Sequence, residues 1–365
     1  MKKLAEGAKK KGLHLLATGD CLQQAWMNEI KKGEMEDGII SYNNMRFILS
    51  TEIEDMHRVH HLILFPSYDS VNEFKKNIEK KCMDCDEGRP HVSLNQAELL
   101  DLAIETNSLI GAAHAFTPWT SLYAYFDSIS CYGGKPHFIE LGLSADANYA
   151  DRIKELNDIT FLSNSDAHSP SPSRLGREFN RMDVNEITWS EIEKAIKKGR
   201  ITNVGFPPEK GKYNRTACTS CYRQYSIEEA KKLKWRCYCG GTIKKGVRDR
   251  VEELANFEKP HHPKWRGDYI HMLPLAEIIS HALHTPQNSS VVIKRWNELL
   301  RLGNEIEIML DIDLEKIRKA TPPAIYTAIK AFREGKIRTL PGGGGRYGEI
   351  FIEELEEKEA MIKWK

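Results

Sequence analysis

Six apolar runs, rich in residues that favour β-strands, alternate with helix-like segments in the first 170 residues of this 365-residue chain. The runs are Gly12–Thr18, Arg46–Ser50, His61–Phe65, Leu109–Ala113, Phe138–Leu141 and Thr160–Ser163. Amphipathic stretches such as Ser70–Lys81 and Asn95–Thr106 lie between them, and strands that alternate with helices predict parallel βαβ units. Six runs in so short a span favour a closed or nearly closed α/β barrel over an open sheet.

Acidic and histidine side chains recur at the ends of these runs. Their positions are Asp20, Glu52, Glu54, His60, His61, His114, Glu140, Asp146, Asp166 and His168. In α/β barrels the catalytic groups come from the C-terminal ends of several strands. Any one of these residues is more often a helix cap or a satisfied polar group, but the same placement on five strands predicts a shared site.

Asp166 and His168 are two residues apart on an extended segment, so both side chains point to the same face. A carboxylate beside an imidazole suits zinc, manganese or iron. Alternation along a strand turns only one of His60 and His61 inward, and His61 is favoured because it directly precedes the apolar run. Glu52 has two oxygens with which to bridge two ions, and the predicted metal ligands are Asp20, Glu52, His61, His114, Asp166 and His168.

Such a site predicts hydrolysis of a phosphate ester. A bound metal ion lowers the pKa of its water toward about 7, and a second ion about 3.5–4 Å away stabilises both the attacking and the leaving oxygen on phosphorus. Asp166, Glu52 and His168 are therefore the predicted catalytic residues, with Asp166 also orienting the nucleophilic water. The expected class is a metal-dependent phosphodiesterase that acts on nucleic acid.

Four cysteines in two close pairs match a structural zinc site. The pairs are Cys218 with Cys221 and, after 15 residues, Cys237 with Cys239. Two pairs separated in this way are typical of a tetrahedral four-thiolate site, and zinc there would fix a segment too polar to fold by itself. Cys82 and Cys85 also have CxxC spacing, but no second pair completes them, so we expect free thiols.

The segment between Lys194 and Arg266 is basic, with 19 Lys and Arg against 7 Asp and Glu, although the whole chain has a formal charge of only +1. Aromatic residues are interleaved with these charges at Tyr213, Tyr222, Tyr225, Trp235, Tyr238 and Trp265. A basic segment with aromatic side chains fits contact with nucleic acid. A solvated charged surface is the alternative.

The C-terminal third is mainly helical in pattern. The expected helices are Leu273–Leu283, Ser290–Leu302 and Ile325–Gly335, and the expected strands are Glu305–Leu310 and Glu349–Ile352. The run Gly342–Gly345 between ordered segments predicts a loop.

Short motifs at the strand ends resemble the successive metal motifs of the PHP (polymerase and histidinol phosphatase) phosphoesterases. They are Gly19-Asp20, Thr51-Glu52, His61–Leu64, Ala113-His114 and Ser165–His168. Longer stretches are similar to one branch of these enzymes, the endonuclease Q family. They are Gly88–Val92, Ala112–Pro118, Phe138–Asp146, Asn164–Pro170 and Arg174–Arg181. The resemblance extends over nearly the whole chain, including the cysteine pairs and the glycine-rich tail.

The resemblance implies a domain organisation and an activity. Residues 1–206 would form a distorted, incomplete PHP-type βα barrel, residues 207–257 a four-cysteine zinc module, and residues 258–365 a helical α+β region with a glycine-rich loop. It also implies two or three divalent ions (zinc, manganese or magnesium). The activity would be that of an endonuclease that cleaves DNA on the 5′ side of deaminated bases, such as uracil or hypoxanthine, or of abasic sites. Its partner would be DNA with damaged bases.

Basic side chains near both predicted metal sites are candidates for phosphate contacts. Arg174 and Arg177 directly follow the Asp-Ala-His motif, and for Arg177 an ion pair with Glu178 is an equal alternative. Pro341–Gly345 would let a DNA backbone approach closely because glycine amides are unobstructed, although a flexible turn is the simpler account. The predicted DNA-binding residues are Arg174, Arg177, Lys244, Lys245, Arg248 and Arg346.

PHP proteins begin with a strand that carries a His-x-His motif, which this sequence lacks. The resemblance therefore implies fewer bound ions than in related proteins. It leaves two rivals open, a small-molecule phosphatase of the histidinol-phosphate kind and a catalytically impaired DNA-binding homologue. A charged N-terminus with no apolar run behind it, and no apolar span of about 18 residues, predict a cytoplasmic protein without a signal peptide or membrane helix.

Overall fold

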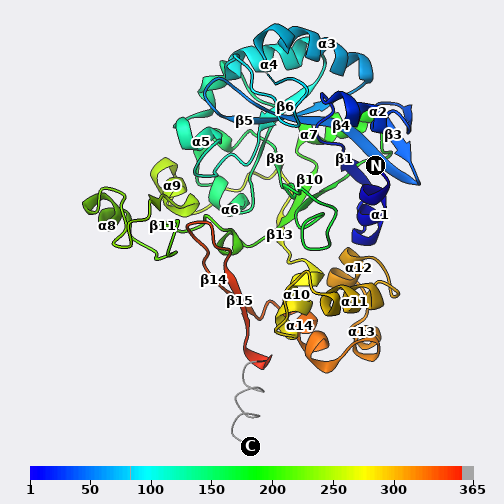
Figure 1. Cartoon of the computed structure of the whole chain (residues 1–365), viewed down its shortest axis with the longest axis vertical. Helices are drawn as coiled ribbons and strands as arrows, with labels where there is room; N and C mark the ends of the chain where they lie inside the picture. Colours follow the sequence, from blue (N-terminus) through cyan, green and yellow to red (C-terminus); the bar gives the residue numbers. More distant parts are fainter. Residues whose placement is uncertain (83, 356–365) are drawn as a thin grey trace, which may run out of the picture.

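The computed structural model describes residues 1–82 and 84–355, and its largest sheet within these ranges has eight strands. The strands are β1 (Leu15–Ala17), β2 (Glu34–Glu36), β3 (Ile39–Tyr42), β4 (Met45–Glu54), β5 (His60–Phe65), β6 (Leu109–Ala112), β7 (Phe138–Glu140) and β8 (Phe161–Leu162). Their order is β2-β3-β4-β5-β6-β7-β8, and β1 pairs with the first half of β4. The sheet curls into a half-barrel (Figure 1), with β2 and β8 at the two ends of the order.

The strand directions differ in part from the expected parallel βαβ units. β1 runs parallel to β4, and β6, β7 and β8 are mutually parallel. β5, however, is antiparallel to both of its neighbours, β4 and β6. Residues 55–59 make only a short turn between β4 and β5, whereas a parallel connection needs a crossover of about a dozen residues or more. All six apolar runs contain strands, but the expectation of a purely parallel arrangement was wrong at β5.

Two helices cover one face of β5 and β6, as Figure 1 shows. They are α3 (Tyr68–Ile78) and α4 (Gln96–Glu105). The Ser67 side chain caps α3, and Asn95 with Glu98 forms a capping box at α4, which satisfies amide groups that a helix start leaves free. The N-terminal helices α1 (Lys2–Lys11) and α2 (Gln24–Ile30) pack near β1 and β4, and the short helices α5 (Leu122–Tyr125) and α6 (Ala147–Ala150) follow β6 and β7.

A smaller sheet extends the layer beyond β8. It has the order β13-β10-β9 and consists of β9 (Phe179–Met182), β10 (Ile201–Gly205) and β13 (Tyr269–His271), with α7 (Trp189–Lys198) between β9 and β10. β9 is antiparallel to β10, and β13 is parallel to β10. The side chain of Asn203 joins the two sheets, because its Nδ2 donates to the carbonyl of Phe161 at 2.9 Å.

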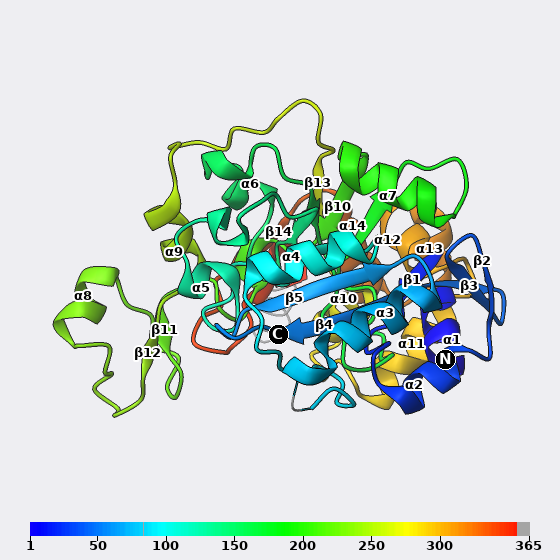
Figure 2. The ribbon, with the colours of Figure 1, turned by 90° about the horizontal axis from the view of Figure 1, so that it is seen from above.

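The four predicted zinc ligands lie in a small unit with its own core. It contains β11 (Ala217–Cys218), α8 (Ile227–Lys232), β12 (Ile243–Lys244) and α9 (Val247–Leu254). Cys218, Tyr225, Ala230, Cys237 and Ile243 form its buried cluster. Figures 1 and 2 place α8 on the opposite side of the molecule from α11, α12 and α13.

In the C-terminal part, as far as residue 355, five helices pack around a separate apolar cluster. They are α10 (Leu275–Ala282), α11 (Ser290–Leu299), α12 (Glu305–Leu310), α13 (Leu314–Ala320) and α14 (Pro323–Arg333). The hairpin β14 (Ile337–Leu340) and β15 (Glu349–Ile352) follows, with the glycine run at its turn. Over the described residues, no helix combines the length and apolarity that crossing a membrane requires.

Residues 305–310, expected as a strand, form helix α12 instead. Asn304 caps this helix and forms a capping box with Glu307, with its Oδ1 accepting from the Glu307 amide at 3.0 Å. Glu305, Ile308 and Met309 are the buried side chains, at helical spacing. The alternation of apolar and acidic residues suggested a strand, but the cap before it starts a helix.

Candidate metal centre

Polar side chains from several strands meet at one edge of the curled sheet. Asp20 follows β1, His114 follows β6 and Asp166 follows β8, and their φ values are positive, at 43°, 31° and 43°. For a residue other than glycine this conformation is uncommon and costs on the order of 1–3 kcal/mol. Such strain clusters at functional sites. Its recurrence at three strand ends therefore marks this edge as a candidate site.

Glu52, His60 and His114 converge at this edge. The Nδ1 atom of His60 lies 3.0 Å from Oε1 of Glu52 and 3.2 Å from Nε2 of His114, and one ligand atom from each residue lies within 4.8 Å of the others. Nδ1 of His114 is buried and has no hydrogen-bond partner among the described residues. Two imidazole nitrogens and a carboxylate oxygen suit zinc or manganese. These three residues therefore fit a divalent ion.

The surroundings keep Glu52 and His114 in forms that bind metal. Burial opposes ionisation of Glu52, but the hydrogen bond to His60 and the electrostatic influence of His114 and Arg89 outweigh it and lower its pKa to about 2. Burial also lowers the pKa of His114, an effect that Glu52 opposes. A carboxylate and a neutral imidazole, the forms that coordinate a metal ion, are thus favoured at neutral pH.

His60, rather than His61, faces this cluster. His61 lies on the opposite face of β5 and is wholly buried. Its Nε2 is 2.9 Å from Oδ2 of Asp55, and its Nδ1 is 2.8 Å from the hydroxyl of Tyr132. Both ring nitrogens of His61 are therefore used inside the core, which corrects the choice of His61 as a ligand. The choice failed because both histidines lie at the start of β5, where alternation along the strand turns His60 toward the edge and His61 into the core.

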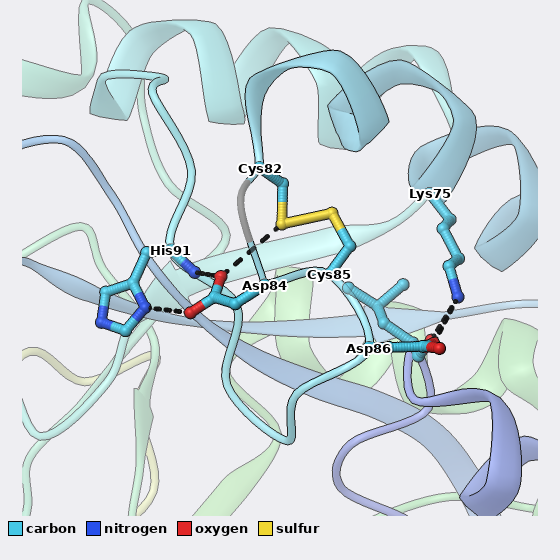
Figure 3. Close-up of a disulfide and its surroundings, with 7 residues drawn as sticks. Lys75, Cys82, Asp84, Cys85, Asp86 and His91 are labelled. Atoms are coloured by element: carbon cyan, nitrogen blue, oxygen red, sulfur yellow. Dashed lines mark hydrogen bonds and ion pairs between the residues drawn. A yellow bond between two sulfur atoms is a disulfide. The ribbon is translucent and has the colours of Figure 1, made fainter.

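A loop closed by a disulfide lies beside the cluster. Cys82 and Cys85 form this disulfide, where free thiols were expected. Their Cα atoms are 5.6 Å apart, within the usual range for a bridge, and CxxC spacing alone does not distinguish a bridge from two free thiols. Asp84, between them, accepts from the backbone N–H of His91 at 2.7 Å and contacts Nδ1 of His91 at 2.5 Å (Figure 3).

The segment that follows this disulfide brings basic side chains to the carboxylates. Nη1 of Arg89 lies 3.3 Å from Oε1 of Glu52, and Nε2 of His91 lies 3.5 Å from Oε1 of Glu54. Glu54 also contacts Nε2 of His60 at 2.8 Å. These contacts orient His60, which uses its other ring nitrogen toward Glu52. Arg89 was absent from the predicted site residues, although it lies in one of the motifs that carried the family resemblance.

Glu140 is a further residue of the site that the predicted ligand set omitted. It ends β7 and accepts from the backbone N–H of His114 at 3.0 Å. Burial, and then the nearby charge of Asp166, raise its pKa well above the ordinary value for a carboxyl. The sequence signal for Glu140 was its position in an apolar run that ends at the same edge.

Asp20, Asp166 and His168 lie around the three convergent residues. Nε2 of His168 is 3.3 Å from Oδ1 of Asp166, and His168 is the more exposed of the two, at 87%. Burial raises the pKa of Asp20, and the neighbouring Glu52 raises it further. Asp166 also acts electrostatically on His114. Asp20 and Asp166 are thus near the cluster, whose convergent ligand atoms come from Glu52, His60 and His114.

The four cysteines form a second candidate site. One sulfur from each of Cys218, Cys221, Cys237 and Cys239 lies within 4.8 Å of the others. Sγ of Cys218 is 3.5 Å from Sγ of Cys239, and Sγ of Cys221 is 3.5 Å from Sγ of Cys237. Four thiolates at about 2.3 Å from zinc would be about 3.8 Å apart, so the arrangement fits a tetrahedral ion. The hydroxyl of Tyr225 lies 2.9 Å from Sγ of Cys237 and lowers its pKa to about 6.

The six predicted DNA-binding residues differ in exposure and in whether their charged groups already bind other protein groups. Arg174 is exposed, and Lys244 lies over the ring of Trp119 at 5.7 Å. Three others are on the surface in ion pairs: Lys245 with Glu253, Arg248 with Asp249, and Arg346 with Glu349. Arg177 is only 5% exposed and donates to protein groups from all three of its nitrogens. A bidentate phosphate contact by Arg177 is therefore a prediction that the structure contradicts. The alternative, an interaction with Glu178, agrees with the electrostatics, because burial raises the pKa of Glu178 and the charge of Arg177 opposes that shift.

The glycine run makes close contacts within the protein. Gly342, Gly343 and Gly344 are buried, and the amide of Arg215 donates to the carbonyl of Gly342 at 2.9 Å. A Cβ added at Gly344 would lie 2.2 Å from the carbonyl oxygen of Cys218. The unobstructed backbone of these three glycines thus approaches the four-cysteine unit, whereas Gly345 is exposed.

Comparison with known proteins gives one family model and several relatives. The model described as the MJ0043 C-terminal domain matches residues 274–336. Protein MJ0043 of Methanocaldococcus jannaschii is 47% identical over 269 residues, which covers 70% of this chain and 34% of that protein. The chain thus spans about a third of the length of this relative.

Two solved structures match over almost the whole chain. The crystal structure of the lesion-specific endonuclease PfuEndoQ from Pyrococcus furiosus is 46% identical with a TM-score of 0.90, and the match covers 97% of this chain and 91% of that one. A crystal structure of endonuclease Q in complex with a 27-mer duplex substrate, with an abasic lesion at the active site, is also 46% identical. Its TM-score is 0.93, and the match covers 97% and 92% of the two chains.

Proposed function

Because the chain belongs to the endonuclease Q family, we propose that it is a metal-dependent endonuclease acting on damaged DNA. Its reaction is hydrolysis of the phosphodiester on the 5′ side of a deaminated base, uracil or hypoxanthine, or of an abasic site. The observation that carries this proposal is the convergence of Glu52, His60 and His114 at a strained strand edge. The chain that forms this edge is 46% identical in sequence to an endonuclease Q whose structure contains duplex DNA with an abasic lesion.

Two or three divalent ions, zinc, manganese or magnesium, are the proposed cofactors at this edge. When bound, they supply Lewis acidity that activates water and stabilises charge on the phosphate oxygens. Glu52, His60 and His114 hold one ion, and Asp20, Asp166 and His168 supply further ligands. Asp166 also orients the attacking water by accepting its hydrogen bond. Arg89 neutralises part of the charge on Glu52, from which it lies 3.3 Å away.

The four-cysteine unit holds a structural zinc ion in this proposal and presents basic groups to DNA. Arg174, Lys244, Lys245, Arg248 and Arg346 contact phosphates, with Lys245, Arg248 and Arg346 exchanging their present carboxylate partners for phosphate oxygens. Such exchange costs little, because surface ion pairs are worth only about 0–1 kcal/mol.

The direct test uses 5′-labelled duplexes that contain one uracil, hypoxanthine or abasic site, with an undamaged duplex as control. We expect the full chain to nick only damaged duplexes in the presence of manganese, magnesium or zinc, and EDTA to abolish nicking. Glu52→Gln removes a charged metal ligand and should abolish nicking too. Tyr326→Phe, on α14 in the C-terminal helical cluster, serves as a control that retains full activity.

Two other outcomes would contradict the proposal. Binding to lesion-containing DNA without nicking under any of the three metals would identify a catalytically impaired DNA-binding homologue. Turnover of small phosphate monoesters without any action on DNA would identify a small-molecule phosphatase.

A further inference from the structure

Arg177 is a buried cation whose three nitrogens bind two different parts of the chain. Its Nε donates to the carbonyl of Ser165 at 2.7 Å, and its Nη2 donates to the carbonyl of Asp166 at 3.2 Å. Its Nη1 donates to the hydroxyl of Tyr347 at 3.1 Å. A buried guanidinium needs such a set of acceptors, because an unpaired buried charge is strongly destabilising. None of the three acceptors is a carboxylate.

The two carbonyls belong to the segment that presents Asp166 to the metal centre. Asp166 has a φ of 43°, which a residue other than glycine adopts only when its surroundings impose it. The hydrogen bonds from Arg177 hold the peptide groups on both sides of the Cα atom of Asp166. A hydrogen bond from the Ser165 hydroxyl to the carbonyl of Glu178, at 2.9 Å, adds a second tie to the same segment. Arg177 therefore fixes the direction in which the Asp166 carboxylate points.

Tyr347 connects Arg177 to the hairpin of β14 and β15, 170 residues further along the chain. The turn of this hairpin is bound to the stretch that leads into the four-cysteine unit. The amide of Gly342 donates to the carbonyl of Glu209 at 2.8 Å, and the amide of Gly345 donates to the carbonyl of Lys212 at 2.9 Å. The ammonium group of Lys212 also lies over the Tyr347 ring, 6.0 Å from its centroid. The position of the Tyr347 hydroxyl is thus set by the hairpin together with the stretch that leads into the cysteine unit.

We infer that Arg177 and Tyr347 are positioning residues that make the geometry of Asp166 depend on the seating of the hairpin against the four-cysteine unit. This inference rests on the proposed function, because it assigns Asp166 to the metal centre. Tyr347 acts through Arg177, and Arg177 acts through the Ser165 and Asp166 carbonyls. Neither side chain touches the substrate or the metal ion.

The test compares Tyr347→Phe, Arg177→Lys and the double variant with the wild-type chain. Tyr347→Phe removes one hydroxyl and keeps the ring, and Arg177→Lys keeps the charge but not the three-way set of donors. Tyr326→Phe and Arg318→Lys, on helices α14 and α13, are the matched controls. Three quantities are measured: the dissociation constant for manganese by calorimetry without DNA, the thermal midpoint, and kcat and KM for nicking.

We expect Arg177→Lys to weaken manganese binding roughly tenfold, the lower end of the range for groups that orient metal ligands, and Tyr347→Phe to weaken it less. Both variants should lower kcat and leave KM for DNA unchanged. The double variant should bind manganese no more weakly than Arg177→Lys alone, because the two residues act in series.

Wild-type manganese affinity in Tyr347→Phe, a variant with little risk of misfolding, would overturn the inference. A raised KM with unchanged kcat would also overturn it, since it would make Tyr347 a DNA contact. Lower thermal midpoints with unchanged manganese affinity would also overturn it, because Arg177 and Tyr347 would then stabilise the fold without positioning Asp166. Failure of the proposed function is separable, because then the wild-type chain itself would not nick, while the manganese titration without DNA would still report on Arg177 and Tyr347.

Discussion

Two adjacent histidines on β5 have opposite surroundings, and their substitution should have opposite effects. His60 faces Glu52 and His114 at the site edge, whereas both nitrogens of His61 bind buried groups in the core. We expect His60→Gln to weaken manganese binding, with a loss of stability that comes from its buried contact with Glu54 at 2.8 Å. His61→Gln should instead destabilise the fold by roughly 2–4 kcal/mol, because it disturbs the hydrogen bonds of the buried Asp55 and Tyr132.

Metal titration and denaturant unfolding of the two variants check this contrast. The assignment of His60 to the metal centre fails if His61→Gln loses manganese affinity while His60→Gln retains it.

The ionisation of Glu178 should make stability depend on pH. Burial is the main cause that raises the pKa of this carboxyl to about 8, and its Oε2 has no hydrogen-bond partner among the described residues. The pKa of this carboxyl in the unfolded chain is about 4.3. Below about pH 4.3 the group is protonated in both states and costs no stability, and the free energy of unfolding falls as the pH rises from about 4.3 toward 8. The slope from this one group is at most about 1.4 kcal/mol per pH unit. Above pH 8 no further loss from Glu178 is expected.

Glu178→Gln should remove this pH dependence, because an amide has no proton to lose and its oxygen retains the role of accepting from the Phe206 amide, at 2.9 Å in the wild type. Urea unfolding at pH 5, 7 and 9 gives the measurement. Parallel stability curves for the two proteins would show that Glu178 ionises normally in the fold.

At the scale of whole elements, the strand positions could be predicted from the sequence, but their directions could not. Apolar runs mark the segments that are buried, and each of the six runs contains a strand. Whether β5 returns antiparallel depends on the short turn before it and on β6 pairing along its other edge, which are contacts between segments far apart in the sequence. This direction brings the start of β5 to the site edge, and alternation along the strand then decides that His60 rather than His61 faces the cluster.

The four cysteines show the opposite case, because a local motif determined the grouping. Their spacing predicted a shared site, and the structure brings all four sulfurs within 4.8 Å of one another. By contrast, the partners of Arg177 lie at Ser165, Asp166 and Tyr347. Tyr347 lies 170 residues from Arg177, so this contact leaves no signal in the sequence beside Arg177. The neighbouring residues in the sequence suggested a phosphate contact instead.

The hairpin turn should be sensitive to side chains for a steric reason. Gly344 has a φ of 65°, and a Cβ there would lie 2.2 Å from the carbonyl oxygen of Cys218. Gly335 has a similar φ, of 67°, but nothing within 4 Å of the added Cβ. We expect Gly335→Ala to cost about 1–2 kcal/mol from its backbone conformation alone, and Gly344→Ala to cost more because the hairpin must also move away from the cysteine unit.

Unfolding free energies and zinc content, measured on both variants, distinguish the two contributions. Equal destabilisation by the two substitutions would show that the contact between Gly344 and Cys218 does not form.

At the scale of the whole molecule, a buried ion pair ties the first helix to the C-terminal helices. Nζ of Lys11, at the end of α1, lies 2.6 Å from Oε1 of Glu305, at the start of α12, and both side chains are at most 2% exposed. Glu305 also accepts from Nε1 of Trp296 at 2.6 Å and from the amide of Leu275 at 3.1 Å. Burial lowers the pKa of Lys11, and Glu305 opposes this shift. The pair thus joins α1 and the C-terminal helices through a contact shielded from water.

Removing one member of this pair should be more damaging than removing both charges. Glu305→Gln leaves the buried Lys11 ammonium without its counter-charge, for which about 3–5 kcal/mol of destabilisation is typical. In the double variant Lys11→Met with Glu305→Gln, methionine fills the space of the lysine stem and glutamine retains acceptors for Trp296 and Leu275. The double variant should therefore be more stable than Glu305→Gln alone, as measured by urea unfolding at pH 7. A double variant whose loss equals the sum of the two single losses would show that Lys11 and Glu305 do not interact.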